Sequence, residues 1–381
     1  MKPVIFAVLT ALVLSSCAPS LAEKMLDSGQ PAGAFMPDTL SFELRRGFIV
    51  VRAKANAGDM PLDFILDSGS PVTALSPSTL SYLGLTAPDD GLQLLDSVRL
   101  GRALALNVAA EARTYPRYSP VKCIAEAGIL GANFMRHFNW VFDFEKQELI
   151  VTPLQQVPGP ATEPAHRLPF RADRYSGLPV LKGQSGPTGK ARFVIGLGQG
   201  LGLRLSAAAP PPGAVRVYDS QIRNPYAQAA EVGYHLPEAA LSAGSLQWSG
   251  TASLSADGAN AIGNEIWANY RVGLRFSTGE LLLWEASSAT ALPPLPALGW
   301  LPLFDPMGGV TVGLVVEGSP AWQAGMRTGD AVLQVGRTAA PGLYNDFCTY
   351  FFGVEADYAA RRSVLVKTAK MAAPVQLQLE N

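Results

Sequence analysis

The sequence predicts a mainly β protein made of two related lobes and a smaller α+β domain at its C-terminal end. Its 381 residues include 37 glycines and 30 prolines, which suits many short strands joined by turns. One pattern of apolar strands and glycine turns occurs twice along the chain, as expected of two copies of one structural unit. A different pattern, in which a strand, a turn and a short helix follow one another, occupies the last part of the chain.

The first lobe, predicted over 39–153, is organised around an acidic turn. Residues 64–66 are apolar and β-prone and predict a buried strand. Asp67, Ser68 and Gly69 follow directly, and all three are turn-forming residues. The sequence therefore predicts a carboxylate presented at the end of a buried strand.

The other elements of the first lobe follow from local patterns. Ser76 can cap a short helix that Pro77 opens, because proline suits the first helical position. Apolar or partly alternating stretches predict strands elsewhere in the lobe. These stretches are 40–44, 48–55, 72–76, 98–104 (a hairpin), 128–130, 140–144 and 148–151, with a further short helix at 133–138.

The second lobe, predicted over 165–286, repeats the first in a degenerate form. Residues 193–198 repeat the pattern of 64–69, and 261–266 follow at nearly the spacing found in the first lobe. Gly196 stands where the first lobe has its aspartate. We therefore expect the fold of the lobe to be kept and its acidic group to be lost.

The two motifs of the first lobe, 64–69 and 128–134, together resemble those of the retropepsin/pepsin-like aspartic peptidases. The resemblance implies that the carboxylate of Asp67 faces a second carboxylate across a cleft. Such a pair shares a proton, so one carboxylate activates water while the other donates to the scissile carbonyl. It also implies that Asp67, Ser68 and Gly69 form the catalytic turn, with the hydroxyl of Ser68 bracing the opposite lobe.

The second lobe lacks the partner carboxylate that this resemblance requires. Gly196 and Leu197 replace the acid and the hydroxyl residue, and no Asp or Glu lies between Asp173 and Asp219. Either Asp67 pairs with its equivalent in a homodimer, which gives an aspartic-type endopeptidase, or the protein is an inactive homologue that binds peptide or serves as an envelope scaffold. An adaptor whose C-terminal domain is the working part is a third possibility.

Three further features bear on this choice. The stretch 87–91 is short for the flap that covers the substrate in that family. Asp143 is expected to be a structural strand residue, whereas Glu265 could face the cleft.

The last domain, predicted over 297–381 after a proline-rich linker, resembles bacterial PDZ domains. A strand at 310–316, a Gly-Ser-Pro-Ala turn, a short helix and a Gly-Asp turn occur in the order of that family. The resemblance implies a loop that binds a peptide carboxylate while the peptide adds as an extra strand. Packing of the domain on the lobes is the alternative, because Pro302 in this loop has no amide hydrogen. The loop would comprise Gly299, Trp300, Leu301 and Leu303.

The N-terminus predicts a signal peptide over 1–16. Its apolar stretch, 4–14, is too short to span a bilayer comfortably. The following Leu-Ser-Ser-Cys resembles the bacterial lipobox, which implies a diacylglycerol on Cys17; a plain secretory signal is the alternative. Residues 17–38 are then a tether to the membrane. Ala18 implies sorting to the outer membrane, with the protein facing the periplasm.

Composition excludes several classes of partner and cofactor. The net charge of −1 argues against a nucleic acid or another polyanion as partner. His137, His166 and His235 are scattered without ligand spacing, so we expect no metal and no cofactor. Cys123 and Cys348 would lie in an oxidising compartment, where they could pair or remain two separate buried thiols.

Overall fold

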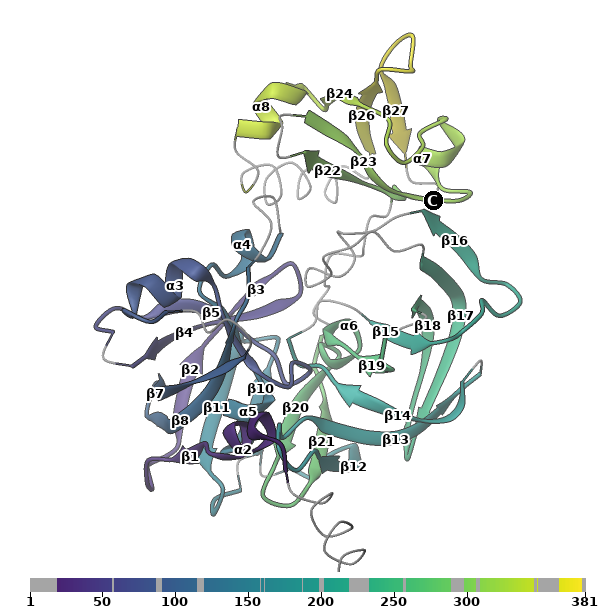
Figure 1. The fold of residues 1–381 in the computed structure, drawn as a ribbon. Coiled ribbons are helices and arrows are strands. Elements are labelled where there is room, and N and C mark those ends of the chain that lie inside the picture. The colour runs from purple at the N-terminus through teal and green to yellow at the C-terminus, as the bar shows by residue number, and fades with distance from the viewer. Residues whose placement is uncertain are drawn as a thin grey trace, which may run out of the picture.

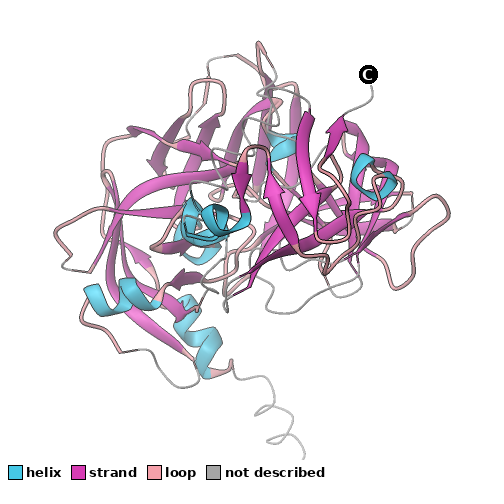
Figure 2. Ribbon diagram, turned by 90° about the horizontal axis from the view of Figure 1, so that it is seen from above, coloured by secondary structure: helices cyan, strands magenta, loops and turns pink. Residues whose placement is uncertain are grey.

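The computed structural model is mainly β, as predicted, with short helices (Figure 2). Within the described residues, no helix is long and apolar enough to cross a membrane. The predicted signal peptide and Cys17 lie outside the described residues. The structure describes 19–56, 58–86, 91–114, 120–157, 159–160, 162–186, 188–198, 202–218, 233–255, 258–288, 298–305, 309–345, 348 and 363–378.

Lobe 1 (38–153) is built around two pairs of parallel strands. β5 runs parallel to β9, while β6 lies between β9 and β8, antiparallel to the first and parallel to the second. The elements are β2 (Asp38–Ser41), β3 (Glu43–Arg45), β4 (Phe48–Ala55), β5 (Leu62–Leu66), β6 (Thr73–Leu75), α3 (Pro77–Tyr82), β7 (Leu92–Leu100), β8 (Ala103–Ala112), α4 (Pro120–Ile124), β9 (Gly128–Leu130), α5 (Ala132–Met135), β10 (Phe138–Asp143) and β11 (Glu148–Pro153).

Lobe 2 (166–285) has the same topology. β14 runs parallel to β19, while β15 is antiparallel to β19 and parallel to β18, which confirms the predicted repeat. Its elements are β12 (His166–Ala172), β13 (Pro179–Ser185), β14 (Gly189–Ile195), β15 (Leu203–Ser206), β16 (Val215–Tyr218), β17 (Gly233–Ala243), β18 (Leu246–Ser255), β19 (Ala261–Ile262), α6 (Asn264–Trp267), β20 (Tyr270–Arg275) and β21 (Glu280–Glu285). Among the described strands, β16 has no counterpart in lobe 1.

An antiparallel platform of six strands joins the lobes. Its order is β2-β11-β10-β20-β21-β12, so each strand of lobe 1 has its counterpart at the matching place in lobe 2. A pseudo-two-fold axis therefore passes between β10 and β20, where Val141 lies opposite Gly273. Asp143 forms an ion pair with Arg271 across this boundary. It is a structural strand residue, as predicted.

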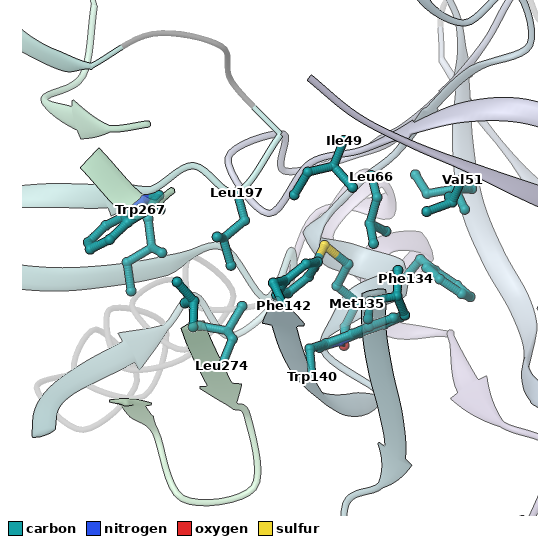
Figure 3. Packing of buried hydrophobic residues seen from close by; sticks show 14 of the residues in the cluster. Ile49, Val51, Leu66, Phe134, Met135, Trp140, Phe142, Leu197, Trp267 and Leu274 are labelled. Carbon is teal, nitrogen blue, oxygen red and sulfur yellow. The ribbon is translucent and has the colours of Figure 1, made fainter. Parts of the chain in front are cut away.

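One hydrophobic core extends through both lobes. Phe142 of β10 and Trp267 of α6 come from different lobes, and Leu197 lies between them (Figure 3). All three side chains are fully buried. Burial of each large apolar side chain contributes about 1.5–3 kcal/mol, so a shared core opposes separation of the lobes.

The C-terminal unit (298–378) has a hydrophobic core of its own, which includes Val312, Met326 and Val335. The predicted short helix is α7, and Ser319 caps it by accepting a hydrogen bond from the amide of Trp322. The elements are β22 (Trp300–Asp305), β23 (Gly309–Val316), α7 (Pro320–Gln323), β24 (Val332–Val335), β25 (Thr338–Ala339), α8 (Ala340–Asn345), β26 (Ser363–Thr368) and β27 (Val375–Gln378).

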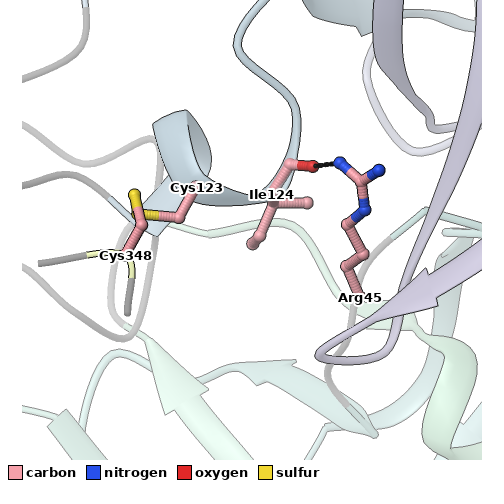
Figure 4. The surroundings of a disulfide bond; sticks show 4 residues. All are labelled: Arg45, Cys123, Ile124 and Cys348. Atoms are coloured by element: carbon pink, nitrogen blue, oxygen red, sulfur yellow. Dashed lines mark hydrogen bonds between the residues drawn. A yellow bond between two sulfur atoms is a disulfide. The ribbon is translucent and has the colours of Figure 1, made fainter. Parts of the chain in front are cut away.

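The C-terminal unit is attached to both lobes and lies above them in Figure 1. β16 of lobe 2 pairs with β23, with Val217 opposite Val316. On the lobe 1 side, Cys123 of α4 forms a disulfide with Cys348, with a Cα–Cα distance of 5.3 Å (Figure 4). The neighbouring carbonyl of Ile124 accepts a hydrogen bond from Arg45 (2.7 Å). Of the two possibilities for the cysteines, the structure has the paired form.

Part of the stretch predicted to be a tether is folded against lobe 1. Ser20 and Glu23 form a capping box at the start of α2 (Leu21–Asp27). β1 (Gln30–Pro31) then pairs with β8. Gly29 packs so closely on His137 that an added Cβ would lie 2.7 Å from the ring Nε2. Small and polar composition alone does not distinguish a linker from a segment whose backbone hydrogen bonds go to a neighbouring strand.

Loss of the disulfide should release the C-terminal unit from lobe 1 while both lobes stay folded. The bond joins cysteines 225 residues apart, so its removal should lower the free energy of unfolding by roughly 2–4 kcal/mol. Denaturant unfolding and limited proteolysis of Cys123→Ser, Cys348→Ser and the double variant measure this. The three variants should behave alike because each removes the same bond; additive losses would contradict the pairing.

His137 should make the protein less stable in acid. Burial, with Arg136 acting in the same direction, lowers the pKa of His137 from 6.5 to about 4. Between these values the unfolded chain binds a proton that the folded chain does not, so the free energy of unfolding falls as the pH drops from 6.5 to 4, by at most about 3 kcal/mol. Chemical denaturation from pH 6.5 to pH 4 should show a smaller change in the free energy of unfolding for His137→Gln than for the wild type, and the wild-type change for the exposed control Ser41→Ala.

Candidate active site

Asp67 lies at the end of β5, where the sequence analysis places it. Its backbone amide donates to the carbonyl of Leu130 on β9 (3.0 Å), so the parallel strand holds the start of the turn. The side chain Oδ1 accepts a hydrogen bond from the amide of Gly69 (2.8 Å). The residue is only 1% exposed. Asp67 is therefore a buried carboxylate held by its own turn.

Gly131, in the second motif of lobe 1 (128–134), allows the two motifs of this lobe to pack against each other. A Cβ on Gly131 would lie 2.6 Å from the carbonyl carbon and oxygen of Val72, so only glycine fits this crossing. The amide of Gly131 donates to the hydroxyl of Thr73 (3.2 Å). The aspartate turn therefore lies directly beside the strand of the second motif, β9.

Asn133 stabilises the same crossing and was not among the predicted site residues. Its Oδ1 accepts from both the amide and the hydroxyl of Thr73 (2.8 and 2.9 Å), and its Nδ2 donates to the carbonyl of Ala109 (2.6 Å). The residue is buried. The sequence gives one indication of this role: Asn133 is a polar residue in an otherwise apolar motif, and a buried polar side chain needs hydrogen-bond partners.

Ser68 connects the aspartate turn to lobe 2. Its hydroxyl donates to the carbonyl of Ile195 (2.6 Å) and accepts from the amide of Leu197 (2.9 Å). The side chain is completely buried, so both backbone groups depend on this hydroxyl for their hydrogen bonds. This is the brace that the resemblance implied for Ser68. Leu197, at the matching position of lobe 2, has no hydroxyl with which to form a second brace.

The turn of lobe 2 packs directly on Asp67. A Cβ added to Gly198 would lie 2.4 Å from both Cα and Cβ of Asp67. Gly196, which stands opposite by the repeat, bonds through its amide to the carbonyl of Ile262 (2.9 Å) and contributes no side chain. The two glycines therefore occupy the side of the site from which a second carboxylate would come.

The other carboxylates singled out in the sequence, Asp143 and Glu265, have contacts of their own. Asp143 is on the platform, in its ion pair with Arg271. Glu265 opens α6 and lies beside Gly202, whose added Cβ would be 2.6 Å from Glu265 Oε2. Partial burial raises the pKa of Glu265. None of the described contacts joins Glu265 to Asp67.

The residues of the predicted carboxylate loop lie at the start of β22. Trp300 is buried in the core of the C-terminal unit, while the carbonyl of Gly299 accepts from the amide of Val316 (2.7 Å). β22 is at the end of its sheet, and the register between β22 and β23 shifts between Leu301 and Pro302.

In the part of the chain that the structure describes, no three His, Cys, Asp or Glu side chains form a group able to hold a metal ion. The described site therefore consists of one carboxylate, one bracing hydroxyl and a glycine turn from the opposite lobe. One carboxylate can act as acid or as base, but it cannot perform both roles at once.

A comparison with solved structures finds two aspartic proteases, each of low sequence identity and low TM-score. The aspartic proteinase from Irpex lacteus is 10% identical, with 68% of this chain and 99% of that chain covered and a TM-score of 0.40. A retropepsin-like aspartic protease from Rickettsia conorii is 19% identical, with 31% of this chain and 92% of that chain covered and a TM-score of 0.24. No family model and no curated protein sequence matches. The fold assignment rests on the strand topology described above.

Removing the brace should destabilise the contact between the lobes. Ser68→Ala leaves a buried carbonyl and a buried amide without partners, so we expect a loss of about 2–4 kcal/mol in the free energy of unfolding. Ser68→Thr keeps the hydroxyl and should lose much less. Gly198→Ala should also be destabilising, because its methyl group meets Asp67.

Denaturant unfolding measures all three changes, with the exposed Ser41→Ala as control. If Ser68→Ala were as stable as Ser41→Ala, the brace would not hold the lobes together.

Proposed function

We propose that this protein is a catalytically inactive homologue of the aspartic peptidases that binds a peptide or protein segment in the cell envelope. The observation that carries the proposal is Gly196 at the position of the second catalytic acid, with Gly198 packed on Asp67. Lipidated Cys17 would hold the protein on the outer membrane, facing the periplasm.

The geometry around Asp67 supports binding over catalysis. Peptide hydrolysis of this type needs a charged and a protonated carboxylate at the same water molecule. Lobe 2 supplies backbone and glycine where the second group is required. Asp67 is also only 1% exposed, so little of its surface can contact water in this arrangement.

A homodimeric peptidase is less compatible with the same contacts. A second Asp67 could approach only if lobe 2 left its place. That would break the hydrogen bonds of Ser68, the pairing of β10 with β20 and the core around Leu197. These interactions are made within one chain, so a second copy has no equivalent face to occupy.

The C-terminal unit offers a binding edge of the kind that its PDZ-like sequence implies. β22 is the last strand of its sheet in the described residues, and an exposed strand edge can take up an extended peptide by main-chain hydrogen bonds. Pro302 removes one donor from this edge. We therefore expect the peptide to pair with only part of β22.

The proposal predicts that the wild-type chain does not cleave peptides. The full chain in detergent micelles is assayed at acidic and neutral pH with and without pepstatin, beside Asp67→Asn and a known aspartic peptidase as positive control. We expect no cleavage above background for either form of this protein. Pepstatin-sensitive cleavage that disappears in a folded Asp67→Asn variant would instead establish an active peptidase and require a second carboxylate.

A further inference from the structure

The solvent face of β13 and β14 in lobe 2 carries a cluster of positive charges. Lys182 lies directly opposite Arg192, and Gln184 lies directly opposite Lys190. All four side chains are exposed and point to the same face, because paired residues share a face of the sheet. Arg171 on β12 lies opposite Val180 and belongs to this face as well.

Lobe 1 shows what this face looks like when its charges are balanced. In the repeat, β4 corresponds to β13 and β5 to β14, since Val51 faces Phe64 as Leu181 faces Phe193. The place of the Lys182–Arg192 pair is taken in lobe 1 by Arg52 opposite Asp63.

Asp63 in lobe 1 balances two cations. Its carboxylate lies 2.7 Å from a guanidinium nitrogen of Arg45 and 3.8 Å from one of Arg52. Glu43, which also pairs with Arg45, is replaced by Arg171 in lobe 2. Two acids of this face, Asp63 and Glu43, therefore have arginines at the matching places in lobe 2, Arg192 and Arg171.

The positive charges of lobe 2 remain unbalanced within the described chain. Lys182, Lys190 and Arg192 take part in none of its ion pairs with Asp or Glu. Like charges directly opposite one another destabilise a sheet. A ligand that neutralises them would remove this cost.

An open pocket of about 490 Å³ lies at the cluster. Its volume is in the range that holds a small molecule or a headgroup. Ser242 of β17 adds a hydroxyl to the cationic lining. The lining includes Lys182, Gln184, Lys190, Arg192, Ser242 and Gly244.

We propose that this pocket binds a phosphate-bearing ligand. Three cations around one pocket match a group with two or more negative charges, and a phosphate ester or diphosphate supplies these charges within a few ångströms. The guanidinium of Arg192 can bind such oxygens in a bidentate manner, while lysines act as point charges. A side-chain carboxylate carries one charge, so an acidic peptide would have to present several residues to a pocket of this size.

The pocket is distinct from the candidate active site. Lys190 and Arg192 lie toward the start of β14, whereas the turn that packs on Asp67 follows its end. Arg192 is four residues from Gly196, or roughly 13 Å along an extended strand. Ligand binding here does not depend on the proposed function of the cleft. The near-zero net charge of the whole chain does not reveal this local cluster.

The first test is calorimetric titration of the full chain in micelles with inorganic pyrophosphate. We expect binding that weakens at least tenfold in the double variant Lys182→Gln/Arg192→Gln. The matched control Arg52→Gln removes the corresponding cation of lobe 1 and should change the affinity less than twofold. Arg192→Asp recreates the charge arrangement of lobe 1, so it should abolish binding without lowering the thermal unfolding temperature.

A second arm distinguishes a soluble phosphate from a lipid headgroup. The full chain is mixed with phosphatidylcholine vesicles with and without phosphatidylglycerol, so that the contribution of the lipid anchor is the same in both. Extra binding to the anionic vesicles that Arg192→Asp removes would assign the phosphate to a headgroup and support the proposal. Equal results for wild type and the double variant in both arms, or binding of poly-glutamate but not of pyrophosphate, would overturn it.

Discussion

The hydroxyl of Ser68 is the constraint on which the relation between the two lobes depends. It holds a carbonyl and an amide of the lobe 2 turn from a completely buried position, next to the carboxylate of the first motif. In a symmetric arrangement each lobe would give and receive one such brace. In this protein Leu197 is part of the hydrophobic core instead. Ser68 of lobe 1 therefore binds lobe 2 through hydrogen bonds, whereas Leu197 of lobe 2 contacts its surroundings through apolar packing.

The two lobes differ elsewhere in the same way: lobe 1 keeps polar and acidic groups that lobe 2 has lost. Lobe 1 keeps the acid of its turn and balances the charges on its outer face with Asp63. Lobe 2 keeps the strand topology but replaces the acid with Gly196. It also has the additional strand β16, which reaches the C-terminal unit. The fold tolerates these changes because the paired backbones and the buried apolar side chains, which define each lobe, are unchanged by them.

Much of the fold was predictable because its signals are local. The aspartate turn and the helix caps at Ser76 and Ser319 each follow from the conformational preferences of a few neighbouring residues. The repeat was visible for the same reason, since two copies of one local pattern need no knowledge of contacts. Once the two copies are aligned, Gly196 stands at the position of Asp67, so the loss of the second acid is visible in the sequence.

The features that escaped prediction all depend on contacts between distant segments. Cys123 and Cys348 can be paired only when the position of the C-terminal unit above lobe 1 is known. The folding of 21–31 against lobe 1 depends on the edge of β8, which composition does not reveal. Likewise, Lys182 and Arg192 become a pair only through the register of β13 and β14.

The disulfide has a consequence for the order in which the protein can be assembled. Cys123 emerges during synthesis long before Cys348, so the thiol of lobe 1 must wait for almost the whole chain. Domains tend to fold as units from the N-terminal end, and lobe 1 with its own strands can form early. The bond can form only when the C-terminal unit lies beside lobe 1, and the same unit also pairs with β16 of lobe 2, so the covalent link marks a chain whose C-terminal unit has docked.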